Sequence, residues 1–282
     1  MQICDTIAGM RQAIRDLRAL DRPSTLGLVP TMGALHAGHL SLVARARREN
    51  SLVAASIFVN PLQFGPNEDL AKYPRTFADD CAQLERAGVD LLFAPTPDEM
   101  YAKSATTMVD PGPVATRLDG VSRPGHFVGV ATVVAKLFHI IQCDRAYFGQ
   151  KDAAQLAVLR QMARDLNFPL ELIACPIVRD GDGLALSSRN RYLTAEERAQ
   201  ALVLPRTLDA LAQCIAAGER DAATLIAAGH AVLRHQPAAV LDYLVFVDPD
   251  TLLPVSEAAT GSLVAIAAKV GTTRLIDNFL VA

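Results

Sequence analysis

The sequence predicts an α/β fold: a parallel sheet with helices on both faces, followed by a smaller C-terminal α+β domain. Short runs of β-branched and aliphatic residues alternate with helical patterns along most of the chain, which is the order that parallel strands joined by crossover helices require. Past residue 194 the pattern changes to alanine-rich helices and then to strand-like runs. A chain of 282 residues is long enough for one large domain or two modest ones.

The first predicted unit is a strand, a helix and a second strand. The strands are "TLGLVP" (25–30) and "SLVAASIFV" (51–59), and "HLSLVARARREN" (39–50) is the helix between them. The next helix, "DCAQLERAG", closes at Gly88, and a buried strand follows at 89–94. This βαβ order predicts a Rossmann-like parallel sheet.

The remaining elements extend that sheet and then form a second one. The pattern predicts helices at 127–143 and 152–166, strands at 145–149 and 169–178, helices within 195–233, and strand-like runs at 240–248, 262–270 and 273–281. The last three runs suggest an antiparallel sheet. We therefore predict a Rossmann-like ligand-binding domain over residues 1–178 and a C-terminal domain over residues 179–282 that acts as a lid.

Composition excludes several classes of function. A net charge of -3 with scattered Lys and Arg argues against a nucleic-acid partner and favours a small-molecule ligand. The five cysteines are widely spaced and form no C-x-x-C pair, so they indicate no disulfide framework and favour a reducing cytoplasm. The charged N-terminus lacks the apolar core of a signal peptide, and no segment has 18 consecutive apolar residues. We expect neither export nor membrane insertion.

Two histidines lie three residues apart in "VPTMGALHAGHLSLV" (29–43), at the predicted start of a helix. A zinc site would need a third ligand and usually H-E-x-x-H spacing, and neither accompanies them. Either the rings only cap and pack the helix, or their N–H groups hold a phosphate beside the positive helix end. Gly38 lets a ligand approach the backbone closely, which favours the phosphate. Neither a P-loop nor a G-x-G-x-x-G motif is present.

A second candidate segment is "YFGQKDAAQL" (147–156), where a strand gives way to a helix. Ligands of open α/β folds bind at the carboxyl edge of the sheet, where Lys151 can reach phosphate oxygens. Alternatively, Lys151 and Asp152 form a solvated first helical turn, in which the helix dipole favours Asp152. Gln155 falls one turn beyond Lys151 on the same helix face.

A third segment, "LALSSRNRYL" (184–193), follows the glycines of "RDGDG". Ser187, Ser188 and Arg189 have the donors needed to surround a triphosphate, and the glycines indicate a mobile connection that can fold over a ligand. The alternative is an exposed loop leading to a helix that Thr194 caps, with Glu197 at the capping-box position.

The fourth segment is "FVNPLQFGPNEDLAKYPR" (58–75), which follows the second strand. Asn60, Gln63, Phe64 and Tyr73 combine polar groups with apolar rings, a mixture that suits a small polar ligand with an apolar body. Taken alone, the segment is an ordinary proline-bearing loop. Its place at the same sheet edge as the other three segments makes it a candidate substrate site.

Together these segments resemble the pantothenate synthetase family, and "HAGH" resembles the H-x-G-H signature of the nucleotidyltransferase superfamily. The resemblance covers nearly the whole chain, including "RPGHFVGVATVVAKLF". It implies a ligase that condenses (R)-pantoate with beta-alanine to give pantothenate, AMP and pyrophosphate through a pantoyl adenylate. It also implies ATP as co-substrate, use of Mg²⁺, a homodimer, and neither a nucleic-acid nor a membrane partner.

The resemblance further implies roles for individual residues. His39 is the proton donor, and Gln63 and Gln155 bind pantoate, with Gln63 also near beta-alanine. Leu186 stands where many relatives have methionine, a volume-conserving change. The implied nucleotide site consists of Met32, Gly33, Ala34, Leu35, His36, Ala37, Gly38, His39, Gly149, Gln150, Lys151, Asp152, Val178, Leu186, Ser187, Ser188 and Arg189.

Chemical reasoning agrees with these roles. An ATP-dependent ligase first attaches a carboxylate to the α-phosphorus and then lets an amine attack the anhydride, so no protein nucleophile is needed. In-line positioning and stabilisation of the developing charge are needed instead. The candidate catalytic residues are His36, His39, Lys151, Ser187, Ser188 and Arg189, the candidate substrate ligands are Asn60, Gln63, Tyr73 and Gln155, and no residue is predicted to ligate a metal.

Two other functions remain open at this point. An adenylyltransferase of the same superfamily would keep AMP on a small-molecule product and would need only one acceptor site. A nucleotide-sensing module would bind ATP without turning it over. Release of AMP that depends on both pantoate and beta-alanine separates the ligase from both.

Overall fold

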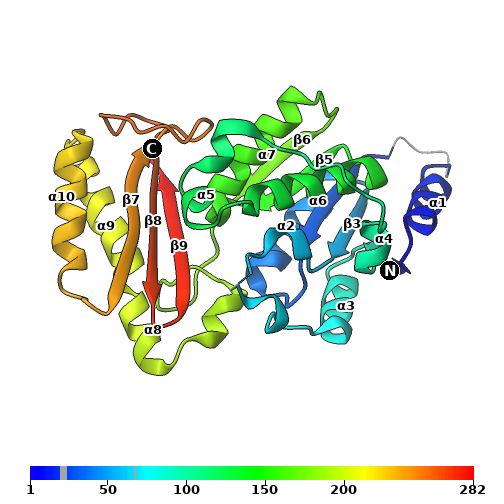
Figure 1. Ribbon diagram of the computed structural model, residues 1–282, viewed down its shortest axis with the longest axis horizontal. Helices are drawn as coiled ribbons and strands as arrows, with labels where there is room; N and C mark the ends of the chain where they lie inside the picture. The colour runs from blue at the N-terminus through cyan, green and yellow to red at the C-terminus, as the bar shows by residue number, and fades with distance from the viewer. Residues whose placement is uncertain (20–23, 67) are drawn as a thin grey trace.

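The computed structural model describes residues 1–19, 24–66 and 68–282. In it the chain forms two sheets (Figure 1). Six parallel strands lie in the order β1-β4-β3-β2-β5-β6, and three antiparallel strands in the order β7-β8-β9. This confirms the predicted fold class. The strands are β1 (Gln2–Cys4), β2 (Leu26–Thr31), β3 (Leu52–Ile57), β4 (Leu91–Phe93), β5 (Arg145–Gly149), β6 (Glu171–Cys175), β7 (Ala239–Val247), β8 (Leu263–Val270) and β9 (Thr273–Leu280).

Helices cover both faces of the parallel sheet. Alternate side chains of a strand point to opposite faces, so Leu28 of β2 packs in one apolar cluster and its neighbour Val29 in another. The cluster around Leu28 is covered by α1 (Ile7–Arg18), α6 (His126–Ile141) and α7 (Ala153–Asp165). The cluster around Val29 is covered by α2 (Ala37–Glu49) and α3 (Phe77–Arg86).

The other helices are short or belong to the C-terminal part. Thr194 and Glu197 form the predicted capping box at the start of α8. None of the helices in the described part of the chain is both long and apolar enough to cross a membrane. The remaining helices are α4 (Pro97–Met100), α5 (Asp119–Ser122), α8 (Ala195–Ala201), α9 (Val203–Ala216) and α10 (Ala222–Leu233), with 3₁₀ turns η1 (Pro61–Gln63), η2 (Asp69–Ala71), η3 (Gly112–Thr116), η4 (Gln150–Asp152) and η5 (Ser188–Tyr192).

The C-terminal helices pack on the antiparallel sheet. Leu208 of α9 and Leu225 of α10 share an apolar cluster with Ile266 of β8. Val247 and Leu263, however, belong to the large cluster beneath the parallel sheet. The division into domains of residues 1–178 and 179–282 therefore stays a prediction.

The order in which the chain adds strands to the parallel sheet reverses between β2 and β5. From β2 the chain continues outward through β3 to β4 on one side, whereas β5 pairs with β2 on the other. Loops that leave the carboxyl ends of two such strands diverge and leave a crevice, which is where open α/β sheets bind ligands. The histidine segment follows β2 and the Lys151 segment follows β5, so topology brings them together.

A close backbone contact fixes the loop that follows β3. Gly129 of α6 packs against η1, and a Cβ atom there would lie 2.1 Å from the carbonyl oxygen of Leu62. Asn60 anchors the same loop, donating from Nδ2 to the Gly129 carbonyl at 3.0 Å. Only glycine allows this approach, so α6 sets the position of Gln63.

We predict that Gly129→Ala lowers the free energy of unfolding by about 1–3 kcal/mol, because the added methyl group forces η1 away from α6. Urea denaturation of the purified protein measures the change. Gly181→Ala is the matched control, since a Cβ atom at Gly181 meets nothing within 4 Å. Equal stability of the two variants would show that the contact is not tight in solution.

Candidate active site

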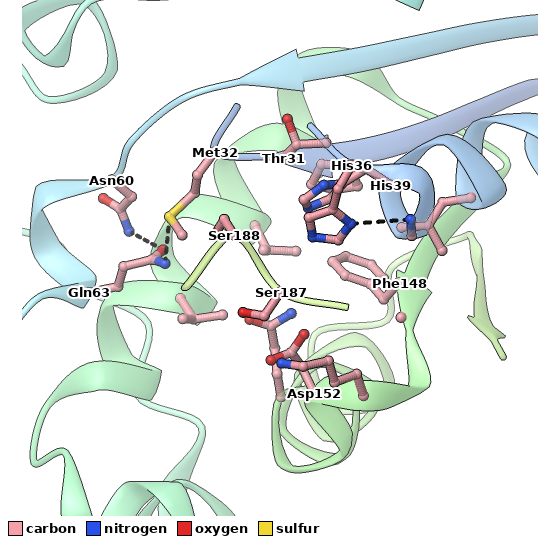
Figure 2. A pocket seen from close by; sticks show the side chains of 18 of the residues that line it. Thr31, Met32, His36, His39, Asn60, Gln63, Phe148, Asp152, Ser187 and Ser188 are labelled. Carbon is pink, nitrogen blue, oxygen red and sulfur yellow. Dashed lines mark hydrogen bonds between the residues drawn. The ribbon is translucent and has the colours of Figure 1, made fainter. Parts of the chain in front are cut away.

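A cavity of about 240 Å³ lies at the crevice between the ends of β2 and β5. Figure 2 shows the two histidines at one end, Asn60 and Gln63 at the other, and Ser188 between them. The cavity brings together most of the residues that the sequence singled out: Met32, His36, Gly38, His39, Asn60, Gln63, Tyr73, Gly149, Lys151, Asp152, Gln155, Val178, Leu186, Ser187, Ser188 and Arg189. Gly33, Ala34, Leu35, Ala37 and Gln150 are not among the residues that line it.

Asp80 holds the turn that leads into the histidines. Its carboxylate is 1% exposed and accepts the backbone N–H groups of Ala34 and Leu35, each at 2.9 Å. The turn needs this support because Gly33 and Ala34 have positive φ angles of 80° and 51°. The N–H groups of Ala34 and Leu35 therefore face Asp80, and neither residue lines the cavity.

Asp80 could not be predicted from the sequence. An aspartate in the first turn of a helix usually interacts with the helix dipole and backbone, and Asp80 lies in the first turn of α3. Nothing in its local pattern distinguishes it from that common role. Besides the hydroxyl of Thr76, its carboxylate binds backbone groups more than 40 residues away in sequence, at positions 34 and 35.

The imidazole ring of His36 caps the N-terminus of helix α2. Its Nδ1 accepts the backbone N–H of Gly38 at 3.1 Å, so in the neutral ring the proton lies on Nε2. Burial, followed by the positive charges of Lys151 and Arg191, lowers the pKa of His36 to about 4. The capping interpretation and the phosphate interpretation therefore both apply, because Nδ1 caps the helix while Nε2–H remains a donor.

His39 lies beside His36, with the ring centroids 4.0 Å apart. Burial, the neighbouring His36 and the charge of Lys151 lower the pKa of His39 to about 3. Its Nδ1 is buried and has no hydrogen-bond partner among the described residues. Both rings are neutral at pH 7, so they offer N–H donors and not positive charges.

Lys151 lies in η4, directly after β5. Its charge is one cause of the low pKa of each histidine, which places the ammonium group near both rings. Asp152 is exposed, and among the described residues it is the only carboxylate that lines the cavity. Gln150 does not line the cavity, because its side chain turns to Asn278 and donates to Oδ1 at 3.2 Å.

Neighbouring side chains hold the amide group of Gln63. Asn60 Nδ2 donates to Gln63 Oε1 at 3.1 Å, and Gln63 Nε2 lies 3.1 Å from the sulfur of Met32. Asn60 is 1% exposed, and its Oδ1 accepts the hydroxyl of Tyr101 at 2.8 Å. The Asn60 amide thus has partners within the protein and orients Gln63, and its role as a substrate ligand stays a prediction.

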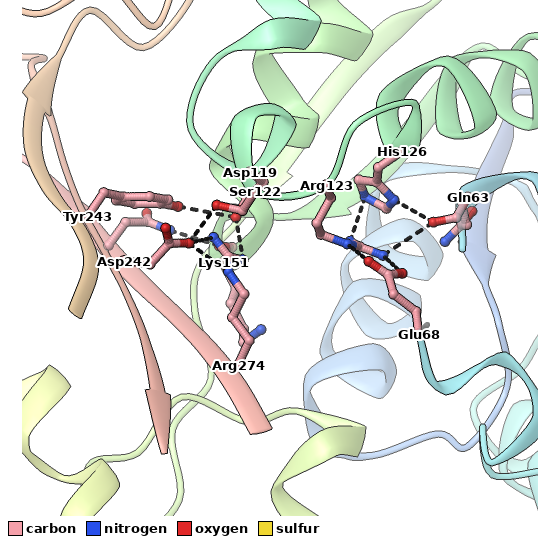
Figure 3. Close-up of polar contacts among 11 residues, drawn as sticks. Gln63, Glu68, Asp119, Ser122, Arg123, His126, Lys151, Asp242, Tyr243 and Arg274 are labelled. Carbon is pink, nitrogen blue, oxygen red and sulfur yellow. Dashed lines mark hydrogen bonds and ion pairs between the residues drawn. The ribbon is translucent and has the colours of Figure 1, made fainter. Parts of the chain in front are cut away.

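Arg123 and His126 hold the backbone of Gln63 (Figure 3). The Gln63 carbonyl accepts from His126 Nδ1 at 2.7 Å and from Arg123 Nη2 at 3.2 Å. Glu68 fixes Arg123 through two bonds of 2.6 Å. Burial and the charge of Arg123 lower the pKa of His126 to about 4, so this ring is also neutral at pH 7.

Neither Arg123 nor His126 was assigned a role from the sequence. Both lie in "RPGHFVGVATVVAKLF", which carried part of the family resemblance. Their partner is a backbone carbonyl about 60 residues away, at position 63. A side chain that binds a distant carbonyl has no spacing signal in the sequence.

The segment that contains Ser187, Ser188 and Arg189 forms another part of the cavity wall. An antiparallel bridge between Arg179 and Ala185 forms a narrow hairpin before it. Ser187 then begins η5, with its hydroxyl accepting the Arg189 N–H at 3.3 Å. Ser188 Oγ lies 3.4 Å from the hydroxyl of Tyr73, so the third and fourth predicted segments meet here.

Comparison with known proteins identifies the family. The sequence model of pantoate-beta-alanine ligase matches residues 2–280. The pantothenate synthetase of Acidobacterium capsulatum is 58% identical over 289 residues, which cover 99% of this chain and 97% of that protein.

Two solved structures are similar over nearly their whole length. The pantothenate synthetase from Thermus thermophilus is 51% identical, with a TM-score of 0.93 over 100% of this chain and 99% of that one. The pantoate-beta-alanine ligase from Francisella tularensis, complexed with beta-gamma ATP and beta-alanine, is 34% identical, with a TM-score of 0.79 over 99% of this chain and 97% of that one. The chain therefore belongs to the pantoate-beta-alanine ligase family, and it is a ligase of pantothenate synthesis.

Proposed function

We propose that the chain condenses pantoate with beta-alanine in two steps, both in the cavity between β2 and β5. In the first step a pantoate carboxylate oxygen attacks the α-phosphorus of ATP, and the bond to pyrophosphate breaks. In the second step the amine of beta-alanine attacks the carbonyl of the adenylate, and AMP leaves as the amine loses a proton. The presence of phosphate donors and amide groups in one continuous cavity supports this proposal.

Pantoate would occupy the end of the cavity that contains Gln63 and Gln155. Their amides can bind its hydroxyl and carboxylate groups. Its geminal methyl groups need an apolar wall, and Val130, Val133 and Val134 of α6 are apolar residues in the cavity lining. Asn60 and the pair formed by Arg123 and His126 hold Gln63 in place for this contact.

The phosphates of ATP would occupy the end that contains the histidines. Lys151 and Arg189 supply positive charge there, and His36, His39, Ser187 and Ser188 supply neutral donors. Donors that are already fixed stabilise charge as it develops on the phosphate oxygens, without reorganising at the moment of reaction. We propose that His39 donates a hydrogen bond to a phosphate oxygen, in keeping with the proton-donor role that the family resemblance implies.

Mg²⁺ fits this site as an ion carried by ATP. No group of three or more His, Cys, Asp or Glu side chains that could hold a metal occurs in the described residues. Mg²⁺ usually keeps several waters and binds substrate phosphates with one or two carboxylates. Asp152 is the carboxylate that the cavity offers. When bound, the ion would neutralise charge on the phosphates.

We also propose a cytoplasmic homodimer. All five cysteines are free, which suits a reducing compartment. The homodimer is what the resemblance to the pantothenate synthetase family implies. Light scattering of the purified protein tests the assembly state.

The experiment that tests the proposed function measures AMP release with each substrate omitted in turn. The ligase requires pantoate and beta-alanine together for sustained AMP release. An adenylyltransferase would retain AMP on its product, and a nucleotide-sensing protein would release none. Sustained AMP release without beta-alanine would contradict the proposal.

We predict that His39→Ala lowers the rate of adenylate formation by about 100-fold or more, as loss of one such donor typically does. The melting temperature should change little by comparison, since the His39 Nδ1 has no partner to lose among the described residues. His235→Ala, at an exposed histidine far along the chain, is the matched control. A well-folded His39→Ala enzyme with near wild-type turnover would remove this residue from the mechanism.

The stability of the protein should fall as pH falls below about 6.5. His36, His39 and His126 have native pKa values of about 4, 3 and 4, against about 6.5 in the unfolded chain. Between those values the unfolded chain binds more protons, so the free energy of unfolding rises with pH. Denaturation at pH 7 and pH 5 should show the loss, and His126→Gln should show a smaller one. An identical pH dependence in both proteins would contradict the low pKa of His126.

Gln155→Ala should weaken pantoate binding more than ATP binding, because in the proposed function its amide binds pantoate from the lining of the cavity. Calorimetric titration with each substrate measures the two affinities. Gln161→Ala is the matched control on the same helix, since that glutamine is bonded at the surface to Asp165. Equal losses of pantoate and ATP affinity would reject the assignment.

A further inference from the structure

The edge strand β9 touches the phosphate end of the site through two adjacent buried residues. Asp277 and Asn278 are 2% and 3% exposed. Figure 1 shows β9 as the strand of the antiparallel sheet that lies on the side of the parallel sheet and its helices. Adjacent residues of a strand point to opposite sides, so the two side chains reach different partners.

Asn278 binds the turn that carries Lys151. Its Nδ2 donates to the carbonyl oxygens of Gln150 and Lys151, at 3.0 and 2.9 Å. Its Oδ1 accepts from the Gln150 side chain at 3.2 Å. Both amide protons and the amide oxygen are therefore used. An asparagine supplies this combination of donors and acceptor, whereas an aspartate of the same shape supplies no donor.

Asp277 binds the hairpin that carries the serines and Arg189. It accepts two bonds from Arg179, at 2.6 and 3.0 Å, and Arg179 lies at the base of that hairpin through its bridge to Ala185. One dipeptide of β9 thus contacts both segments that supply phosphate donors.

A separate ion-pair cluster fixes β9 to α5. Arg274 of β9 lies 2.6 Å from a carboxylate oxygen of Asp119 in α5 and 2.7 Å from one of Asp242 in β7 (Figure 3). Ser122 of α5 donates to Asp242 at 2.7 Å. This cluster binds β9 to α5 independently of the Asn278 contacts.

We propose that Asn278 is a positioning residue for adenylate formation, holding two successive carbonyls of η4 so that the Lys151 ammonium group faces the phosphates. This inference rests on the proposed function, in which Lys151 binds ATP. The turn is only three residues long and precedes α7 directly, so fixing two of its carbonyls fixes the point on the backbone from which the lysine side chain starts. Displacement of a reacting group by about 1 Å can lower a rate by about 100-fold.

The test is a double-mutant cycle on pyrophosphate exchange into ATP, measured with Mg²⁺, ATP and pantoate. We compare Asn278→Ala and Lys151→Ala with the double variant. If Asn278 acts through Lys151, Asn278→Ala lowers the exchange rate about 10- to 100-fold in the wild-type background and less than about 2-fold in the Lys151→Ala background. Pantoate affinity should be unchanged in Asn278→Ala, because Gln63 is held by other residues.

Two further variants keep the cycle interpretable. Asn278→Leu keeps a branched side chain, removes the two donors and adds no charge, so it should reproduce the loss if Asn278→Ala folds poorly. Leu280→Ala lies two residues along the same strand, at a side chain that is 45% exposed, and should leave exchange unchanged. Full exchange activity in a folded Asn278→Leu enzyme would overturn the proposal.

The outcomes separate this inference from the proposed function. An equal loss from Asn278→Ala in both backgrounds would overturn the positioning role, because the effect would not pass through Lys151. Wild-type exchange in Lys151→Ala would instead remove Lys151 from the proposed function and the inference with it. Absence of exchange in the wild-type enzyme would reject the two-step reaction itself.

Discussion

The pairing of β2 with β5 is the constraint on which the site depends. Gly27 lies opposite Arg145 and Leu28 opposite Ala146, and this parallel contact joins two parts of the sheet that the chain builds separately. It places the end of β2, which leads into the histidine segment, beside the end of β5, which leads into the turn that carries Lys151. The loops then diverge around the cavity, and the β9 strand covers the phosphate end. Without that pairing the four polar segments would have no common location.

Local patterns in the sequence were sufficient for much of the fold. The strand predicted at 145–149 is β5, and the runs predicted at 240–248, 262–270 and 273–281 are the antiparallel strands. These elements have strong hydrophobic patterns. Neither β1 nor α1 was predicted. A strand of three residues is too short to show alternation, and it is stabilised by pairing with β4 across almost 90 residues of chain, at Gln2 and Leu91.

The residues that position the site were harder to find than those that line it. Lys151 and Gln63 are noticeable because polar groups beside strand ends suggest binding. Asp80, Arg123 and Asn278 instead bind backbone groups of distant segments. A backbone carbonyl or N–H group is the same in every residue, so it leaves no sequence signal. Tertiary structure is required to identify such contacts.

Burial also decides the charge of the histidines, which the sequence leaves open. The environments of His36 and His39 keep both rings neutral at pH 7, so in the proposed reaction the positive charge beside the phosphates would come from Lys151 and Arg189. A neutral donor gains strength as negative charge develops opposite it. A buried imidazolium beside Lys151 would suffer repulsion in every state of the reaction.

The proposed reaction requires that this site activates pantoate on ATP before the amine is needed. The most direct measurement is exchange of labelled pyrophosphate into ATP, with enzyme, Mg²⁺ and pantoate present and beta-alanine absent. We predict exchange that requires pantoate and does not require beta-alanine. Exchange that begins only when beta-alanine is added would contradict the two-step reaction.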